Sequence, residues 1–222
     1  MKFYNKALTL KKIKCKNAFI PKFLIINTQE FFKKKEMILK KIVNNFSKDS
    51  FLIVRSSSLD EDTSSKSNAG RFESVPMVKN EEYNIDIAIR KVINSYKKNK
   101  KNSIVFVQKM ISDCSFSGVI TTCNLSNQAP YYVINYFEGK DTSATTAGKA
   151  NTKNYFQFKY SNKLGNKKFI KIIKLAKELE KKFNNNYLDI EFGYKKGKVY
   201  LFQVRPIILK KKKIFFDKKI FE

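Results

Sequence analysis

Two short polar segments, far apart in the sequence, carry side chains whose types and spacing suit the binding of phosphate and of a metal ion. The first begins with Arg55, which directly follows the apolar run 51–54 and leads into the serines of 56–58. A guanidinium group is a rigid, permanently charged fork that matches phosphate oxygens, and serine hydroxyls and backbone N–H groups add further donors. An ion pair between Arg55 and an acidic residue of 60–62, with the serines in a turn, fits the same residues equally well. The segment is a candidate anion site, and both interpretations remain open.

The second polar segment lies in a predicted β-hairpin. Strands at 188–192 and 198–204 flank a Lys-Lys-Gly turn, which favours a tight connection. Asp189 and Glu191 are two residues apart on the first strand, so they share one face, while the apolar residues between them share the other.

The second strand of this hairpin repeats the alternation. Gln203 and Arg205 share one face, and Tyr200, Phe202 and Val204 are expected on the opposite face. If the polar faces of the two strands coincide, two carboxylates, an amide and a cation come together. Mg²⁺ takes oxygen ligands, usually one or two carboxylates with water and substrate phosphates. A solvated sheet face with cross-strand ion pairs explains the same pattern, so both interpretations stay open here too.

Apolar periodicity places these segments in a fold that mixes helices and strands. The expected helices span 81–98 and 169–183, and the expected strands outside the hairpin span 51–54, 104–108, 118–122, 131–136 and 154–158. Two polar loops, at 56–70 and 139–153, are rich in small residues, and loops of this length are uncommon unless they are functional or disordered. We expect them to approach a ligand.

The composition limits the class of protein. The chain has 222 residues, of which 42% are hydrophobic and 14% aromatic, which is enough for one domain or one two-lobed unit with a real core. The net charge of +27 suggests an anionic partner, but only four of the 46 basic residues are arginines and the lysines are scattered along the chain. This charge predicts weak, salt-sensitive binding to polyanions. A dedicated nucleic-acid partner is not expected.

The cysteines and the apolar runs indicate a compartment. There are three cysteines, an odd number, without a Cys-x-x-Cys motif, so neither a disulfide framework nor a zinc site is expected and a reducing environment fits. No apolar run reaches the length of a membrane span, and Pro21 and Lys22 interrupt the only candidate for a signal peptide. We expect a cytoplasmic protein without a membrane partner.

Eight short motifs follow one another along the chain from about Lys6 to Pro206. They are Lys6-Ala7-Leu8-Thr9-Leu10, Ile20-Pro21-Lys22-Phe23, Val54-Arg55-Ser56-Ser57-Ser58 with Glu61-Asp62, Ala69-Gly70-Arg71-Phe72-Glu73-Ser74, Val107-Gln108-Lys109-Met110, Ser117-Gly118-Val119, Asp189-Ile190-Glu191 and Gln203-Val204-Arg205-Pro206. In this order they resemble the motifs of the N-terminal ATP-grasp nucleotide-binding domain of the phosphoenolpyruvate synthase and pyruvate phosphate dikinase family.

The resemblance implies an α+β fold of the ATP-grasp type, with two lobes, mixed or antiparallel sheets and a nucleotide cleft between the lobes. It implies an N-terminal lobe at 1–108, a C-terminal lobe with the metal-binding hairpin at 109–209, and a basic tail or linker at 210–222. The implied cofactors are ATP and Mg²⁺.

The resemblance also implies residue roles. Lys6 and Arg55 hold the triphosphate, with Arg55 and Arg205 as the catalytic cations. The hinge formed by Gln108, Lys109 and Met110 presents its backbone to the adenine edge. The implied phosphate-covering loop contains Ala69, Gly70 and Ser74. Glu191 and Gln203 ligate Mg²⁺, with Asp189 in support and Arg205 on phosphate.

The sequence departs from the family pattern in two places. Tyr4-Asn5 replaces the Gly-Gly before the early lysine, and the segment 136–142 replaces Gly-Leu-Gly-Glu. The second variant, like the beginning of the chain, resembles a subgroup that includes the glutamine kinase of capsule phosphoramidate synthesis.

The chain has no histidine, whereas the full family enzymes pass phosphoryl groups through a histidine on a mobile domain. The chain also ends soon after Pro206, where the family's later domains would begin. We therefore expect a Mg·ATP-binding part of a phosphotransferase, which donates a phosphoryl or pyrophosphoryl group to a histidine on a separate domain or chain. The final acceptor would be glutamine or pyruvate. The alternative is a catalytically silent nucleotide-binding or assembly subunit. A basic nucleic-acid binder ranks last, because it explains none of the ordered motifs.

Overall fold

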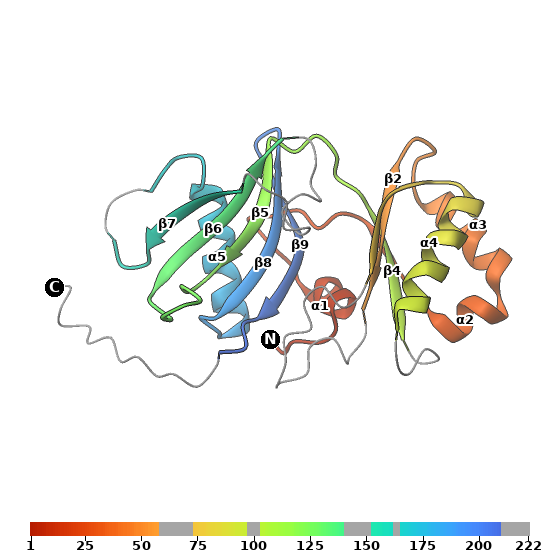
Figure 1. Ribbon diagram of the computed structural model, residues 1–222, viewed down its shortest axis with the longest axis horizontal. Coiled ribbons are helices and arrows are strands. Elements are labelled where there is room, and N and C mark those ends of the chain that lie inside the picture. The colour runs from red at the N-terminus through yellow and green to blue at the C-terminus, as the bar shows by residue number, and fades with distance from the viewer. Residues whose placement is uncertain (58–72, 97–102, 140–151, 162–164, 210–222) are drawn as a thin grey trace. The chain divides into compact units, whose positions relative to one another are not determined.

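The computed structural model describes residues 1–57, 73–96, 103–139, 152–161 and 165–209, which form two compact units (Figure 1). The N-terminal unit comprises Tyr4–Ile13 and Ile20–Asp113. The C-terminal unit comprises Met1–Phe3, Lys14–Phe19 and the chain from Cys114 onward. Each unit contains one antiparallel sheet, with four helices in the described part of the N-terminal unit and one in that of the C-terminal unit, so the fold belongs to the predicted α+β class.

The N-terminal unit is built on a four-stranded antiparallel sheet in the order β1-β4-β2-β3. Its strands are β1 (Phe23–Asn27), β2 (Phe51–Ser56), β3 (Ser74–Lys79) and β4 (Ile104–Lys109). Its helices are α1 (Lys6–Lys12), α2 (Thr28–Lys33), α3 (Lys35–Asn45) and α4 (Glu82–Ser95).

The two faces of this sheet differ because strand residues alternate in direction. Leu52 and Val54 of β2 lie in the hydrophobic core with residues of α2, α3 and α4. Ile53 between them and Arg55 after them point to the other face. Figure 1 shows α1 on the side of the sheet opposite α4. The apolar alternation of β2 thus fixes which face carries its arginine.

The C-terminal unit contains a five-stranded antiparallel sheet in the order β7-β6-β5-β8-β9. Its strands are β5 (Phe116–Thr121), β6 (Tyr131–Glu138), β7 (Lys153–Phe158), β8 (Leu188–Lys195) and β9 (Lys198–Pro206). The helix α5 (Ile170–Phe183) lies along one face (Figure 1). Leu188, Ile190 and Phe192 of β8 are fully buried, whereas Asp189 and Glu191 between them are partly exposed.

Gly118 allows the close approach of β5 and β6. A Cβ atom at this position would lie 2.1 Å from the carbonyl oxygen of Asn135 and 2.8 Å from the Cα of Tyr136. Only a residue without a side chain fits, so this glycine is needed to bring β5 close to β6.

The hairpin of β8 and β9 has the predicted connection. Lys195 pairs with Lys198, and the two residues between them have positive φ, 48° at Lys196 and 77° at Gly197. Positive φ at both central residues is the geometry of a type I′ turn, so the prediction of a tight hairpin is confirmed.

A β-bulge corrects one prediction about β9. Glu191 pairs with Gln203, but Phe192 pairs with Leu201, so Phe202 is an extra residue on its strand. Leu201 therefore enters the core, and Tyr200 pairs with Gly193 on the face of Glu191. The Phe202 ring lies over Gly193, where a Cβ would be 2.6 Å from its Cζ. The expectation that Tyr200 and Phe202 oppose Gln203 was wrong, because simple alternation does not allow for a bulge.

The remaining predicted helices and strands are confirmed with shifted ends. The predicted helices at 81–98 and 169–183 correspond to α4 and α5, although 97–102 lie outside the described residues. No disulfide joins Cys15, Cys114 and Cys123, all three of which are among the described residues. Within the described ranges, no helix has the length and apolar character needed to cross a membrane.

Candidate functional site

In the N-terminal unit, the predicted anion-binding arginine lies on a buried polar stretch of the sheet. Arg55 pairs with Phe106 in β4, and Ile53 pairs with Gln108, so Arg55, Phe106 and Gln108 share a face. Arg55 is 8% exposed, and its guanidinium carbon lies 5.7 Å from the centre of the Phe106 ring. The aromatic ring supports the cation from one side, so the structure holds a positive charge in a fixed place on this face.

The helix α1 brings Lys6 to the same unit. Lys6 is the first residue of α1, and Asn5 caps the helix by accepting a hydrogen bond from the Leu8 N–H at 3.0 Å. The next N–H, that of Ala7, donates to Ser57 Oγ at 2.9 Å. The contact joins the neighbour of Lys6 to a residue two positions beyond Arg55, so the two predicted triphosphate ligands belong to directly connected segments.

The predicted phosphate-covering loop is described only at its end. Ser74 pairs with Arg55 across β2 and β3, so the structure brings these two predicted residues together. Ala69 and Gly70 lie outside the described residues. Their role in covering phosphate stays a prediction.

Two backbone N–H groups of the predicted hinge at the end of β4 are hydrogen-bonded to carbonyl groups of the same unit. The Lys109 N–H donates to the carbonyl of Lys22, and the Met110 N–H donates to that of Phe51, both at 2.9 Å. Contacts from these two residues to a base must therefore come from atoms other than these N–H groups. The Gln108 side chain is 1% exposed, and its Nε2 has no hydrogen-bond partner among the described residues. A buried amide donor of this kind is a group that a ligand or a water molecule would satisfy.

In the C-terminal unit, the hairpin assembles the predicted metal and phosphate residues on one face. Asp189 pairs with Arg205, and Glu191 pairs with Gln203 two residues further along each strand. The expected stacking of the two polar faces is thus present.

Within this face, Asp189 and Arg205 form an ion pair. Asp189 Oδ2 accepts from Arg205 Nε at 2.8 Å and lies 2.7 Å from Nη2. The side chains are 18% and 24% exposed. The cross-strand ion pair foreseen as the alternative interpretation therefore exists for this pair, and it fixes the direction of the arginine.

The second pair of this face suits a hard cation. Glu191 supplies carboxylate oxygens and Gln203 an amide oxygen, the donor types that Mg²⁺ prefers. No group of three or more His, Cys, Asp or Glu side chains that could hold a metal occurs within the described part of the chain.

Ser117 is a further polar residue on this face, and it was not singled out as a site residue. It pairs with Gly193 in β8, and its buried Oγ has no hydrogen-bond partner among the described residues. The Ser-Gly-Val motif marked the position in the sequence, but the motif did not show that the hydroxyl would be buried beside a glycine.

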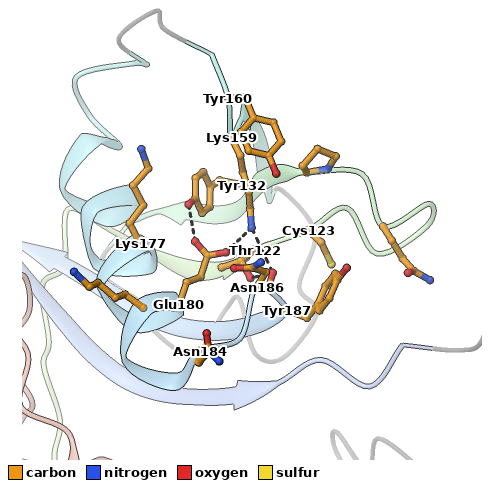
Figure 2. A pocket seen from close by; sticks show the side chains of 13 residues that line it. Thr122, Cys123, Tyr132, Lys159, Tyr160, Lys177, Glu180, Asn184, Asn186 and Tyr187 are labelled. Carbon is orange, nitrogen blue, oxygen red and sulfur yellow. Dashed lines mark hydrogen bonds and ion pairs between the residues drawn. The ribbon is translucent and has the colours of Figure 1, made fainter. Parts of the chain in front are cut away.

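A groove of about 500 Å³ in the C-terminal unit contains none of the predicted site residues (Figure 2). Glu180 lies in its wall, where its carboxylate accepts a hydrogen bond from the Tyr132 hydroxyl at 2.6 Å and pairs with Lys159. Burial, and next the bond to Glu180, raise the pKa of Tyr132. Lys159 also donates to the carbonyl of Asn186 at 3.4 Å. Since these groups satisfy one another, we interpret them as a clamp that ties α5 to the segment before β8.

Comparisons with known proteins agree with these features. The sequence model of the family described as "Pyruvate phosphate dikinase, AMP/ATP-binding domain" matches residues 25–143, which is more than half of the chain. No curated protein matches the sequence at a significant level.

Solved structures show the fold. D-alanine–D-alanine ligase from Helicobacter pylori is similar with a TM-score of 0.53 at 15% identity, over 91% of this chain and 54% of the ligase. PH1788 from Pyrococcus horikoshii Ot3 is similar with a TM-score of 0.52 at 14% identity, over 93% of this chain and 90% of that protein. The chain thus spans about half the length of the ligase. The fold is of the ATP-grasp type, as the sequence predicts.

Proposed function

This chain belongs to the family of the pyruvate phosphate dikinase AMP/ATP-binding domain, and on that premise we propose that it binds Mg·ATP and donates a phosphoryl or pyrophosphoryl group to a histidine elsewhere. The observation that carries the proposal is the buried cation Arg55 in the family's Val-Arg-Ser-Ser motif, directly connected to the segment of Lys6. Two cations on connected segments suit an anionic ligand such as the triphosphate of a nucleotide.

We assign the roles of the N-terminal unit as follows. Arg55 and Lys6 bind the triphosphate, and Ser74 supports them from the end of the preceding loop, where Ala69 and Gly70 would cover the phosphates. Gln108 contributes its buried amide to the base, together with backbone atoms of the hinge. These groups position the nucleotide and neutralise its charge, which is the main work of a protein in phosphoryl transfer.

In the C-terminal unit, Glu191 and Gln203 would hold Mg²⁺, and Asp189 would fix Arg205 toward phosphate. The metal ion would neutralise charge on the phosphates. The protein's own contribution is a carboxylate and an amide oxygen held side by side by strand pairing.

The acceptor histidine must come from another domain or chain, because this chain has none. An imidazole nitrogen would form a bond to the transferred phosphorus atom, and the bond to the leaving phosphate oxygen of the nucleotide would break. Glutamine and pyruvate remain the predicted final acceptors.

Isothermal titration calorimetry tests the binding step. We expect ATP to bind only weakly without Mg²⁺, and Arg55→Ala to lower the affinity by about 1.5–3 kcal/mol, the range for hydrogen bonds to charged groups. Arg90→Ala is the matched control, because Arg90 belongs to the same unit but pairs with Asp86 on the exposed side of α4. An intact fold without ATP binding would end the proposal.

One observation favours the silent nucleotide-binding or assembly subunit as a second candidate. Arg205 is already bonded to Asp189, and a guanidinium held by a carboxylate is less available to phosphate. Incubation with labelled ATP and a histidine-bearing partner domain separates the two candidates. Labelled histidine supports the phosphotransferase, whereas ATP binding without transfer supports the silent subunit.

A further inference from the structure

Ser57 connects two segments that are fifty residues apart in the sequence. Its Oγ accepts the hydrogen bond from the Ala7 N–H, and the contact is buried. Ala7 directly follows Lys6, and Ser57 lies just beyond the end of β2, two residues after Arg55. The serine therefore links α1 to the strand that carries the arginine.

The backbone of Ser57 is held from the other side by Tyr96. The Ser57 N–H donates to the carbonyl of Ile104 at 2.9 Å and approaches the Tyr96 hydroxyl at 3.2 Å. The Tyr96 hydroxyl in turn donates to the same carbonyl at 2.6 Å. Ser57 is 0% and Tyr96 1% exposed. Because buried hydrogen bonds of this kind are costly to leave unmade, Ser57 has a fixed position.

Helix α1 needs such an anchor. It has only seven residues, and isolated helices of that length are not stable in water. Its cap fixes where the helix begins, through bonds of Asn5 and Tyr4 to residues of the helix itself. The hydrogen bond from the Ala7 N–H to Ser57 Oγ joins α1 to the residue that directly follows β2.

We propose that Ser57 is a positioning residue, which sets Lys6 relative to Arg55 before the nucleotide binds. This proposal rests on the proposed function, since it takes both cations as ligands of the triphosphate. A preformed arrangement of charges avoids the entropic cost of ordering a short helix on binding. Ser57 itself acts through α1, and its N–H is already used within the unit.

The test measures the affinity for ATP and for adenosine in Ser57→Ala by calorimetry. We expect ATP to bind about three- to tenfold more weakly, the equivalent of one hydrogen bond, and adenosine, which has no phosphates, to bind unchanged. Ser50→Ala is the matched control, because Ser50 is a buried serine of the same unit whose hydroxyl bonds to Ser47 instead. It should leave both affinities unchanged.

A double-mutant cycle with Lys6→Ala distinguishes positioning from a general structural role. If Ser57 acts through Lys6, Ser57→Ala weakens ATP binding further by less than twofold once Lys6 is absent. Equal effects with and without Lys6 would overturn the proposal, and so would an unchanged ATP affinity in folded Ser57→Ala. If the wild-type protein does not bind ATP, the proposed function itself fails. If the wild-type protein binds ATP and folded Ser57→Ala binds it equally well, only the positioning role of Ser57 fails.

Hydrogen exchange tests the structural step without nucleotide. In Ser57→Ala, and to a smaller degree in Tyr96→Phe, the amide of Ala7 should exchange several-fold faster relative to the same amide in Ser50→Ala. Unchanged exchange at Ala7 would show that α1 is not held by Ser57 and would overturn the proposal.

Discussion

Replacing Glu180 tests whether the clamp in the groove wall holds the C-terminal unit together. Its carboxylate accepts from Tyr132 and pairs with Lys159, and the two charged side chains are only 10% and 12% exposed (Figure 2). Glu180→Leu leaves a largely buried ammonium group and a buried phenol without their common acceptor. The variant therefore measures how much stability the C-terminal unit loses when the Glu180 carboxylate is removed.

The magnitude follows from the burial of the pair. Removing one partner of a buried ion pair costs roughly 3–5 kcal/mol, because the remaining charge stays desolvated. Since the pair forms the wall of an open groove, water reaches Lys159 after the change, and we expect the lower end, about 3 kcal/mol. Replacing both residues, as in Glu180→Leu with Lys159→Met, should cost clearly less than the sum of the single changes, because no unpaired charge remains.

Urea denaturation provides the measurement. The chain has eleven tyrosines and no tryptophan, so tyrosine fluorescence and far-ultraviolet circular dichroism can both follow unfolding. Lys177→Met is the matched control for Lys159→Met. Lys177 also lines the groove but is exposed, so its replacement should change the free energy of unfolding by less than about 0.5 kcal/mol.

Two outcomes would refute this reasoning. A loss below about 1 kcal/mol in Glu180→Leu would mean that the pair is solvated like a surface ion pair. Strict additivity of the single changes in the double variant would mean that Glu180 and Lys159 do not act as a unit.

Three further changes give independent checks. Gly118→Ala should destabilise the protein by about 3 kcal/mol in urea denaturation, because its Cβ would lie 2.1 Å from a carbonyl oxygen of β6; wild-type stability would contradict the close strand approach. Asn80→Asp should cost about 3 kcal/mol near neutral pH, because the Asn80 amide donates to three carbonyls near the end of α3 that would face a carboxylate. The loss of stability should shrink in acid as that carboxylate is protonated, and a loss independent of pH would contradict this explanation. Burial, and next the charge of Glu178, raise the pKa of the Cys15 thiol to about 12 against the opposing effect of Lys182. Alkylation of Cys15 in the folded protein should therefore stay slow through about pH 9, where an unfolded thiol is already largely ionised, and fast labelling at that pH would show the thiol to be open to solvent.

The sequence predicted the C-terminal unit better than the N-terminal unit, and element length explains part of the difference, although α3 with its eleven residues was not predicted either. The helix α5 and the strands β6, β8 and β9 repeat or alternate over eight or more residues, so their periodicity is clear. In the N-terminal unit, α1, α2 and β1 have only five to seven residues. Such short elements carry too few repeats to be distinguished from loops, and tertiary packing decides their structure.

The strand β3 and the bulge in β9 were not predicted from the sequence for a different reason. β3 contains Pro76 and then Met77 with a φ of 57°, at an irregular step of its pairing with β2. A proline lowers the expectation of a strand. In β9, the extra residue Phe202 shifts the residues before it to the other face, and nothing in an alternating pattern marks where a strand bulges.

The polar residues of the candidate site could be predicted in type but not in their contacts. Strand alternation placed Asp189 and Glu191 on one face, and the pairing with Arg205 and Gln203 confirmed it. The Ser117 hydroxyl lacks a hydrogen-bond partner among the described residues, and this could not be foreseen, since it depends on which residue of a distant strand lies opposite. Partners of this kind follow from the register, which the sequence does not state directly.

The departure at Tyr4-Asn5 shows how a changed motif can still stabilise the helix that begins at Lys6. Asn5 is 4% exposed and caps α1 through its side chain. The N–H and carbonyl of Tyr4 both bond to Thr9 Oγ1, at 2.9 and 3.0 Å, and Lys12 lies 3.7 Å above the centre of the Tyr4 ring. A glycine pair would keep the two backbone bonds to Thr9 but would lose the Asn5 cap and the contact between Lys12 and the Tyr4 ring. The replacement therefore strengthens the beginning of α1, the helix whose first residue is Lys6.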